Sequence, residues 1–200
     1  MKFSSRMLIT LLAFATLTGC GSEPEFRHPE VEPLEPAAEV AGPNWDGELF
    51  RLSDHQGEIS VVMFGYTYCP DICPITLSKM KSVKAQLGDD AGDVNFVFIT
   101  VDPERDTQEK LAEYIPGFDP DFYGVYLEGR ALEEVKAGYS AVSEKRYAGG
   151  AKEGDFYYVD HTSNLFVIDR QGNLRLRIPM TAEVEDMAAD LKALLQEETA

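Results

Sequence analysis

Two cysteines and one distant histidine are the residues of this chain best suited to chemistry. Cys69 and Cys73 lie four positions apart in the segment Tyr-Thr-Tyr-Cys-Pro-Asp-Ile-Cys-Pro, and His161 follows much later in the chain. Thiolates are soft ligands that prefer Cu(I) or Zn(II), whereas imidazole accepts several metals, including both oxidation states of copper. Three such ligands are enough for trigonal Cu(I), but structural zinc usually takes four. Because the sequence offers no obvious fourth ligand, the set favours copper.

Thiol chemistry without a metal is the alternative for the same cysteines. In a thiol–disulfide oxidoreductase, one thiol attacks a disulfide of a partner protein and the other resolves the mixed disulfide. Thioredoxins, however, have two residues between their cysteines, whereas this chain has Pro70, Asp71 and Ile72. A structural disulfide would close so small a loop that it would constrain the unfolded chain little. A peroxiredoxin-like peroxidase is least favoured, because the threonine expected three residues before the reactive cysteine is Tyr66.

The cysteine pair lies where a buried strand is predicted to run into a helix. Residues 59–64 are apolar enough for the strand, and Pro74 fits the first position of the helix, where its missing N–H does no harm. Leu77, Met80 and Val83 recur at helical spacing, so Met80 is expected in the core rather than on a metal. A thiol near a helix N-terminus has a lowered pKa, because the helix dipole favours the thiolate. That property favours metal binding, disulfide formation and thiol exchange alike.

Strands and helices alternate along the rest of the chain. Residues 94–101 are almost all apolar, as expected of a central strand covered on both faces. Residues 143–160 are rich in Gly, Tyr and charge, and we expect a loop or hairpin there, near the histidine. The closing helix is predicted to have Thr181 as its N-cap. Further strands are predicted over residues 48–52, 123–126, 164–168 and 174–178, and further helices from residue 107 and over residues 132–139.

This order of elements predicts the fold class. Strand–helix alternation followed by a hairpin and a last helix favours an α/β, thioredoxin-like fold with a central mixed β-sheet flanked by helices. Residues 48–52 and 59–64 are expected to form an N-terminal β-hairpin across the turn Asp-His-Gln-Gly, in which His55 is an ordinary hydrogen-bonded residue. His161 lies just before a strand, at the end of the sheet that faces the cysteine loop. It is therefore the expected third ligand.

The N-terminal residues have the features of an export signal. Lys2 and Arg6 provide a positive start, an apolar stretch too short to span a bilayer follows, and Leu-Thr-Gly-Cys then resembles a lipobox that ends at Cys20. We therefore expect a lipoprotein signal peptide over residues 1–19 and a diacylated Cys20, since two acyl chains are enough for stable attachment. The protein would be anchored to a membrane of the bacterial cell envelope. Its domain would face the periplasm, where thiols can be oxidised.

Residues 20–43 are expected to be a tether. They contain five prolines and six glutamates, a composition that keeps a chain extended and cannot bury a core. His28 within this segment is expected to have no special role. The globular domain is accordingly predicted over residues 44–200.

Length and charge limit the functions open to the chain. Its 200 residues are enough for one domain with a core, and its formal net charge is −17. A surface that binds nucleic acid must be basic, so nucleic-acid binding is excluded from the expected functions. The acidity favours a cationic or metal-bearing partner, although only weakly.

Three segments of the chain together resemble the Sco/SenC family. They are Tyr-Thr-Tyr-Cys-Pro-Asp-Ile-Cys-Pro at 66–74, Val-Asp-Pro-Glu-Arg-Asp-Thr at 101–107 and Asp-His-Thr at 160–162. The similarity runs from Trp45 to the C-terminal helix, with the segments in the expected order. The resemblance implies that Cys69, Cys73 and His161 bind copper. It also implies a role in assembly of the dinuclear CuA centre of cytochrome c oxidase subunit II.

The resemblance leaves two activities open, because copper delivery and reduction of the CuA cysteines both use Cys69 and Cys73. We expect a metallochaperone more than an enzyme. The expected partners are subunit II and, through the lipid anchor, a membrane, with other periplasmic copper chaperones or thiol reductants as further candidates. Asp102 and Arg105 are expected to brace the loop after the central strand. Asp71 could tune the cysteine loop, contact a partner or be a solvated turn residue.

Overall fold

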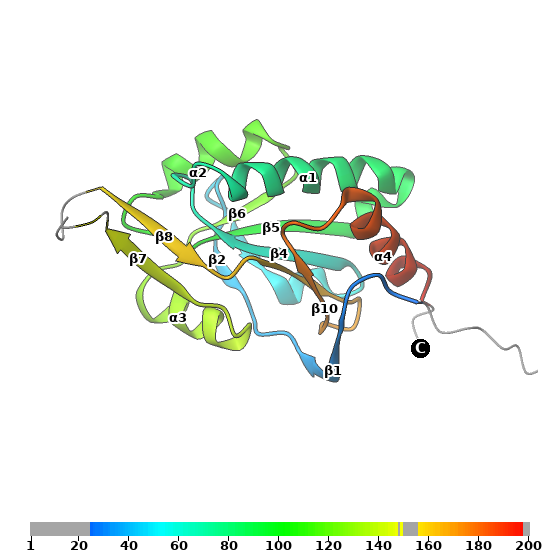
Figure 1. Ribbon diagram of the computed structural model, residues 1–200. Coiled ribbons are helices and arrows are strands. Elements are labelled where there is room, and N and C mark those ends of the chain that lie inside the picture. The colour runs from blue at the N-terminus through cyan, green and yellow to red at the C-terminus, as the bar shows by residue number, and fades with distance from the viewer. Residues whose placement is uncertain (1–24, 148, 150–155, 198–200) are drawn as a thin grey trace, which may run out of the picture.

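The computed structural model describes residues 25–147, 149 and 156–197 (Figure 1). The predicted signal peptide, the predicted lipidation site Cys20 and the first residues of the predicted tether lie outside these ranges. Within them, no helix combines the length and the apolar composition needed to cross a bilayer.

A six-stranded mixed sheet forms the centre of the molecule (Figure 1). Its strands follow the order β1 (Glu30–Pro36), β10 (Asn173–Pro179), β9, β4, β5 and β6. β4 (Ile59–Gly65) runs parallel to β5 (Val94–Thr100), and β5 runs parallel to β6 (Tyr123–Val125). β9 (Asn164–Ile168) lies antiparallel on the other side of β4, which is buried along its whole length. The predicted α/β class with a central mixed sheet is confirmed.

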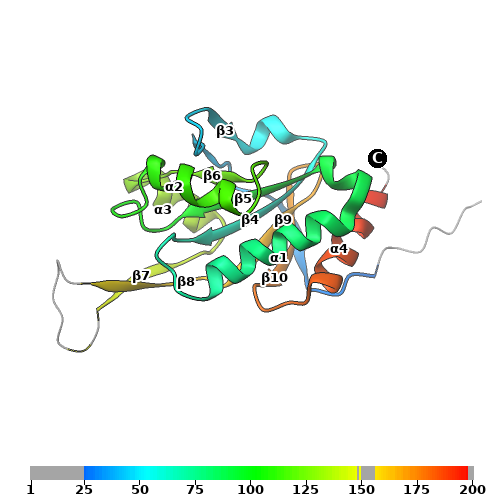
Figure 2. The same ribbon diagram turned by 90° about the horizontal axis from the view of Figure 1, so that it is seen from above.

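Helices cover both faces of this sheet. α1 (Ile72–Leu87) and α4 (Val184–Gln196) pack against each other on one face, and α3 (Gly129–Gly138) lies on the other (Figure 1, Figure 2). On the α3 face, the Phe64 and Tyr139 rings meet with 5.7 Å between their centroids. Because alternate side chains of a strand point to opposite faces, each central strand contributes to two apolar layers.

The connections after β5 are mostly helical. α2 (Gln108–Tyr114) begins after Thr107, whose side chain accepts a hydrogen bond from the backbone N–H of Lys110. Thr107 is therefore the N-cap, and the predicted start of this helix is confirmed. Short 3₁₀-helices fill other connections: η1 (Leu52–His55), η2 (Gly88–Asp93) and η3 (Ile115–Gly117).

Two two-stranded hairpins lie beside the central sheet. β2 (Ala41–Pro43) pairs with β3 (Leu49–Arg51), and β7 (Ser143–Tyr147) pairs with β8 (Tyr157–His161). The N-terminal hairpin is therefore present, but residues 59–64 are not its second strand, because their apolar run is buried in the central sheet. The hairpin expected near the histidine is β7–β8, which extends beyond the body of the molecule (Figure 1, Figure 2).

The predicted tether is wrong for most of its length. β1 (Glu30–Pro36) pairs antiparallel with β10 (Asn173–Pro179), and Val40 is fully buried. Prolines are tolerated in β1 because it is an edge strand, with only one side in the hydrogen-bonded ladder. Nδ1 of His28 lies 2.7 Å from a carboxylate oxygen of the buried Asp190, so His28 has a structural role. The folded part therefore begins before the predicted boundary.

Two helices begin at other residues than predicted. α1 begins at Ile72 with Asp71 as its N-cap, so Pro74 is the third residue of the helix rather than the first. A proline is still tolerated there, because backbone N–H groups of the first turn have no partner within the helix. α4 begins at Val184, and Thr181 is not its N-cap.

Candidate metal centre

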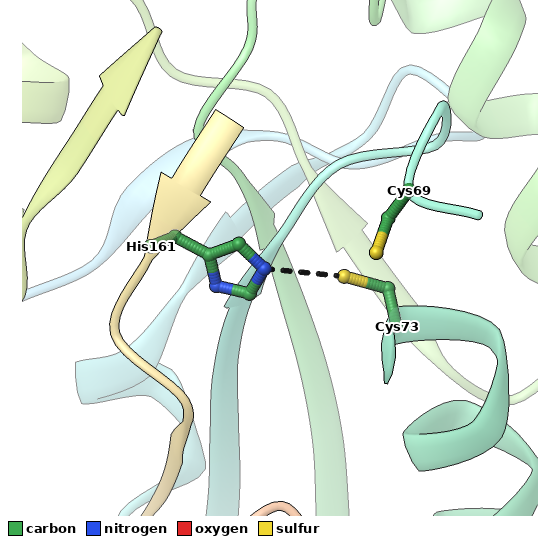
Figure 3. A group of neighbouring side chains, drawn as sticks. All are labelled: Cys69, Cys73 and His161. Atoms are coloured by element: carbon green, nitrogen blue, oxygen red, sulfur yellow. Dashed lines mark hydrogen bonds between the residues drawn. The ribbon is translucent and has the colours of Figure 1, made fainter. Parts of the chain in front are cut away.

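Three separate elements bring Cys69, Cys73 and His161 together. Cys69 lies in the loop between β4 and α1, Cys73 is in the first turn of α1, and His161 is the last residue of β8. Their ligand atoms all lie within 4.8 Å of one another, and Figure 3 shows both sulfurs turned toward the imidazole. Across the described ranges, no second group of this kind forms from His, Cys, Asp or Glu side chains. The fold thus assembles the three side chains singled out from the sequence.

Cys73 is fully buried, and a glycine makes room for its sulfur. A Cβ on Gly65, the last residue of β4, would lie 3.0 Å from Cys73 Sγ and 2.7 Å from Cε2 of Phe98. Both distances are shorter than ordinary van der Waals contacts, so the sulfur can lie against the end of the strand only because the side chain is missing. Cys69 retains 9% of its surface. It is therefore the cysteine that a partner can reach.

His161 presents one ring nitrogen to the sulfurs. Nε2 lies 3.5 Å from Cys73 Sγ, and Nδ1 lies 3.0 Å from the carbonyl oxygen of Thr162. A carbonyl oxygen only accepts, so Nδ1 carries the proton and donates it, which leaves the lone pair of Nε2 directed at the cysteines. Metal-binding histidines are commonly oriented in this way. The Tyr66 ring also meets the imidazole at 87°, with 5.9 Å between the centroids.

The two free thiols, Cys69 and Cys73, differ in pKa. The pKa of Cys69 is lowered to about 3, chiefly because the Cys73 thiol donates a hydrogen bond to its sulfur. The pKa of Cys73 is raised, because its thiol donates that bond and because it is buried. The lowering expected of thiols near a helix N-terminus is therefore found for Cys69 and not for Cys73. At neutral pH the pair holds one thiolate, and a metal bound by both sulfurs must displace the Cys73 proton.

A buried carboxylate holds the cysteine loop. Asp106 accepts hydrogen bonds from the backbone N–H of Thr67 at 2.9 Å and from the Thr67 hydroxyl at 2.6 Å. The hydroxyl of Thr100, at the end of β5, donates a third at 2.7 Å. Burial raises the pKa of Asp106, although these donors favour its charged form. Because Thr67 lies two residues before Cys69, the bonds determine where the loop leaves β4.

The turn that contains Asp106, over residues 102–106, also holds β8, the strand that ends at His161. Tyr157 of β8 donates from its hydroxyl to Asp102 at 2.7 Å, and its carbonyl accepts from Nη1 of Arg105 at 2.8 Å. Arg105 is ion-paired with Asp102 through Nε, and its guanidinium lies 3.7 Å from the centre of the Tyr157 ring. Asp102 and Arg105 brace the loop after the central strand, as expected. The brace extends further than expected, because it includes the strand that carries His161.

Residues 102–106 therefore form one turn that is bonded to both halves of the site, and we call this turn the bracket. From the sequence we assigned no role to Asp106, Thr67 or Tyr157. Asp106 belongs to the Val-Asp-Pro-Glu-Arg-Asp-Thr segment, so a signal for it was present. Thr67, which bonds to Asp106, is far from it along the chain. Tyr157 is likewise far from its partner Asp102, so only the fold brings each pair together.

The remaining candidates lie outside the group of ligands. Nδ1 of His55 lies 3.0 Å from Glu58 and its ring stacks on Phe50, as expected of a hydrogen-bonded loop residue. Met80 is buried in the core, as predicted. Asp71 is exposed at the N-cap of α1, and its side chain makes no capping hydrogen bond.

Comparison with known proteins agrees with the geometry. The family model described as SCO1/SenC matches residues 41–196. The chain belongs to the SCO1/SenC family. A SCO2-like protein of Rickettsia typhi is 35% identical over 127 residues, which cover 64% of this chain. The match spans 62% of that protein, just under two thirds of its length.

Solved Sco structures share the fold of this SCO1/SenC chain. The structure of Bradyrhizobium japonicum ScoI with copper bound has a TM-score of 0.71 and 32% identity, and covers 80% of this chain and 99% of that one. BsSco, described as a member of the Sco family of cytochrome c oxidase assembly proteins with a disulfide switch, has a TM-score of 0.61 at 19% identity. That match covers 82% of this chain and 96% of BsSco. The predicted thioredoxin-like class is confirmed.

Proposed function

We propose that this Sco-family chain is a copper metallochaperone that serves assembly of the CuA centre of cytochrome c oxidase. The observation that carries the proposal is the group of Cys69, Cys73 and His161, whose ligand atoms lie within 4.8 Å of one another. Two sulfurs and one imidazole nitrogen suit both Cu(I) and Cu(II). The likeness to a Sco protein solved with copper bound supports the same metal.

The chain's own groups determine how copper is held as cargo. Cys69 is already a thiolate, and Cys73 becomes one when its proton leaves. His161 offers Nε2, and its orientation is fixed because Nδ1 donates to the Thr162 carbonyl. With three ligands rather than the four of a structural zinc site, the site keeps a position for a ligand from an acceptor.

Release proceeds by stepwise exchange of ligands. Cys69 and His161 reach the surface, whereas Cys73 is buried, so a thiolate or imidazole of the acceptor replaces the outer ligands first. Each step forms one bond to copper as another breaks, so the ion is never released into solution. Cys73 is the last ligand to leave, and it takes up a proton again when copper has gone.

The same cysteines support a second function, which is reduction of the cysteines of the CuA site. The Cys69 thiolate would attack an acceptor disulfide, forming a mixed disulfide and releasing one acceptor thiolate. Cys73 would lose its proton and attack the sulfur of Cys69, which releases the second acceptor thiolate and leaves a Cys69–Cys73 disulfide. Two electrons pass to the acceptor, and a thiol reductant must restore the pair. Because the oxidised pair offers no thiolates, this reaction and copper binding exclude each other.

We further infer that the chain is a lipoprotein of the bacterial cell envelope. The lipobox-like Leu-Thr-Gly-Cys supports attachment to a membrane through diacylated Cys20, with the domain in the periplasm. The proposed acceptor is subunit II of cytochrome c oxidase. Other periplasmic copper chaperones or thiol reductants are the proposed sources of copper and electrons.

Copper stoichiometry and spectroscopy of the reduced protein test the main proposal. The protein must keep residues 30–43, because β1 and β2 belong to the fold. We expect about one copper per chain, with thiolate-to-copper absorption in the Cu(II) form. Cys69→Ser, Cys73→Ser and His161→Ala should each lose this signal.

His55→Ala is the matched control, since this histidine is bonded to Glu58 away from the site, and it should keep the copper signal. Failure to bind copper tightly, together with fast reduction of a disulfide substrate that survives His161→Ala, would overturn the metallochaperone and leave the reductase.

A further inference from the structure

Large apolar side chains are exposed mainly near the metal ligands. In the part of the chain that the structure describes, seven such side chains are exposed. Five belong to segments that carry the ligands or pair with those segments: Tyr68, Ile75, Val142, Phe156 and Tyr158. The other two, Leu34 and Leu49, lie on β1 and β3. Single exposed apolar residues are ordinary, but a cluster at one site indicates a binding surface.

Three of these side chains are aromatic and form one continuous surface, which we call the aromatic rim: Tyr68, Phe156 and Tyr158. The rings of Phe156 and Tyr158 meet edge to face with 5.1 Å between their centroids. Tyr68 and Phe156 both lie over Arg105, whose guanidinium carbon is 5.0 Å from the first ring centre and 5.9 Å from the second. Each ring of the rim exposes between 45% and 59% of its residue's surface.

The rim begins at the metal site and continues along the hairpin. Tyr68 directly precedes Cys69, the more accessible sulfur. Alternation along β8, which belongs to the projecting hairpin (Figure 2), places Tyr158 on the strand face opposite His161. Because Cys73 is buried, copper can enter or leave only beside Cys69 and His161. A protein that exchanges copper directly must therefore approach Tyr68, the part of the rim beside Cys69.

Among the described residues, several charges near the rim are paired within the chain. Lys145 forms an ion pair with Glu104, and Arg146 forms one with Asp160. Arg105 lies beneath the aromatic rings. The rim itself thus consists of apolar rings, although the whole chain carries −17. Apolar burial rather than charge would hold a partner there, and buried aromatic side chains often carry most of the binding energy of an interface.

We propose that the aromatic rim is the docking surface for the protein with which this chain exchanges copper. The inference rests on the proposed function and adds the chemistry of the partner. The partner carries its own thiol or imidazole copper ligands on an exposed loop, and apolar side chains surround that loop. With those side chains on the rim, the loop reaches Cys69 and His161.

Binding and copper transfer are measured separately with the double variant Phe156→Ser/Tyr158→Ser. The probe is the copper-free CuA domain of cytochrome c oxidase subunit II, studied by calorimetry for binding and by copper absorption for transfer. We expect the variant to bind about tenfold more weakly and to transfer copper more slowly by a similar factor when the acceptor is dilute. A small Cu(I) chelator needs no docking surface, so its extraction of copper should be unchanged.

Leu34→Ser/Leu49→Ser is the matched control, because it removes two exposed apolar side chains away from the metal site. It should bind and transfer like the original chain. Unchanged binding and transfer in Phe156→Ser/Tyr158→Ser would overturn the docking surface and leave the proposed function intact. Binding of the original chain without copper transfer or disulfide reduction would contradict the proposed function and leave the docking surface standing.

Two further outcomes would also overturn the proposal. One is a dimer of the original chain, detected by sedimentation, that Phe156→Ser/Tyr158→Ser converts to a monomer, which would make a second copy the occupant of the rim. Absence of any binding between the original chain and the CuA domain would overturn both the docking surface and the proposed acceptor.

Discussion

The two halves of the metal site are held in different ways. The cysteine half is set into the body of the molecule, where Cys73 lies against the end of β4 and the loop is bonded to the buried Asp106. The histidine half lies on the β7–β8 hairpin, which projects from the body and is tied back to the bracket through Tyr157 (Figure 1). A displacement of the hairpin would therefore move His161 and leave both sulfurs in place.

This difference matters for copper because the two oxidation states need different ligands. Cu(I) is satisfied mainly by the thiolates, whereas imidazole helps to admit Cu(II). Changes in the cysteine half should therefore weaken binding of both states, and changes in the histidine half should weaken binding of Cu(II) more.

The largest effect is expected from Asp106→Ala in the cysteine half. The substitution leaves the N–H of Thr67 and two hydroxyl groups without their acceptor. Because a hydrogen bond to a charged group contributes about 1.5–3 kcal/mol, we expect the free energy of unfolding to fall by about 3 kcal/mol. Binding of Cu(I) and of Cu(II) should both weaken. Denaturant unfolding and copper titration measure the two effects.

Asp121→Asn is the control for that substitution, because its exposed carboxylate is ion-paired with Lys84, and its backbone N–H, which donates to Asp119, is kept. It should change the free energy of unfolding by less than about 1 kcal/mol. If Asp106→Ala weakened only Cu(II) binding, the cysteine half would not depend on the bracket.

Gly65→Ala should have the next largest effect. The new Cβ would meet Phe98 and the sulfur of Cys73, so one of them must move. We expect a loss of about 2 kcal/mol in the free energy of unfolding, as for other overpacked cores. The thiolate-to-copper absorption should also shift, because Cys73 changes position. Gly92→Ala, where an added Cβ meets nothing within 4 Å, should change neither quantity.

Tyr157→Phe tests the histidine half and should cost about 1 kcal/mol, since it removes one hydrogen bond to Asp102. Competition titrations should show weaker Cu(II) binding and nearly unchanged Cu(I) binding. Tyr139→Phe, which removes a hydroxyl bonded to the carbonyl of Ala38 away from the bracket, is the control. Equal weakening of both oxidation states by Tyr157→Phe would show that the two halves are not held separately.

The smallest change is expected in the reactivity of Cys69 toward iodoacetamide. The pKa of Cys69 is lowered to about 3, so its thiolate persists as pH falls and is lost only near that value. The alkylation rate of the reduced, copper-free protein should therefore vary little between about pH 8 and about pH 5. Tyr157→Phe should leave this profile unchanged, because it acts on the other half. A rate that falls tenfold with each pH unit would contradict the lowered pKa.

Long apolar runs were the most predictable part of the fold. Residues 59–64 and 94–101 were identified as buried strands because only a sheet covered on both faces buries such runs. The predicted pairing of residues 48–52 with residues 59–64 was wrong, because strand pairing depends on the whole sheet. The helix starts at Pro74 and Thr181 were also misplaced, since propensity does not decide which loop residue takes up helical geometry first.

At the N-terminus, the prediction made from composition was wrong. The prolines and glutamates of residues 30–36 predicted an extended tether, and the segment is indeed extended. It belongs to the fold nonetheless, because an edge strand needs a partner on one side only and leaves its polar side chains in solvent. His28 was missed for the same reason, since its partner Asp190 lies on α4 at the other end of the chain.

The sequence by itself determined which groups are available for chemistry. Thiols and imidazoles are suited to soft metals whatever the fold, and their types and spacing can be read directly. Only the tertiary structure decided that these groups meet within 4.8 Å and that Cys69 rather than Cys73 carries the charge. It alone decided that the bracket holds both halves of the site. Distances, burial and hydrogen bonds between remote residues arise from strand pairing and packing, which no local pattern specifies.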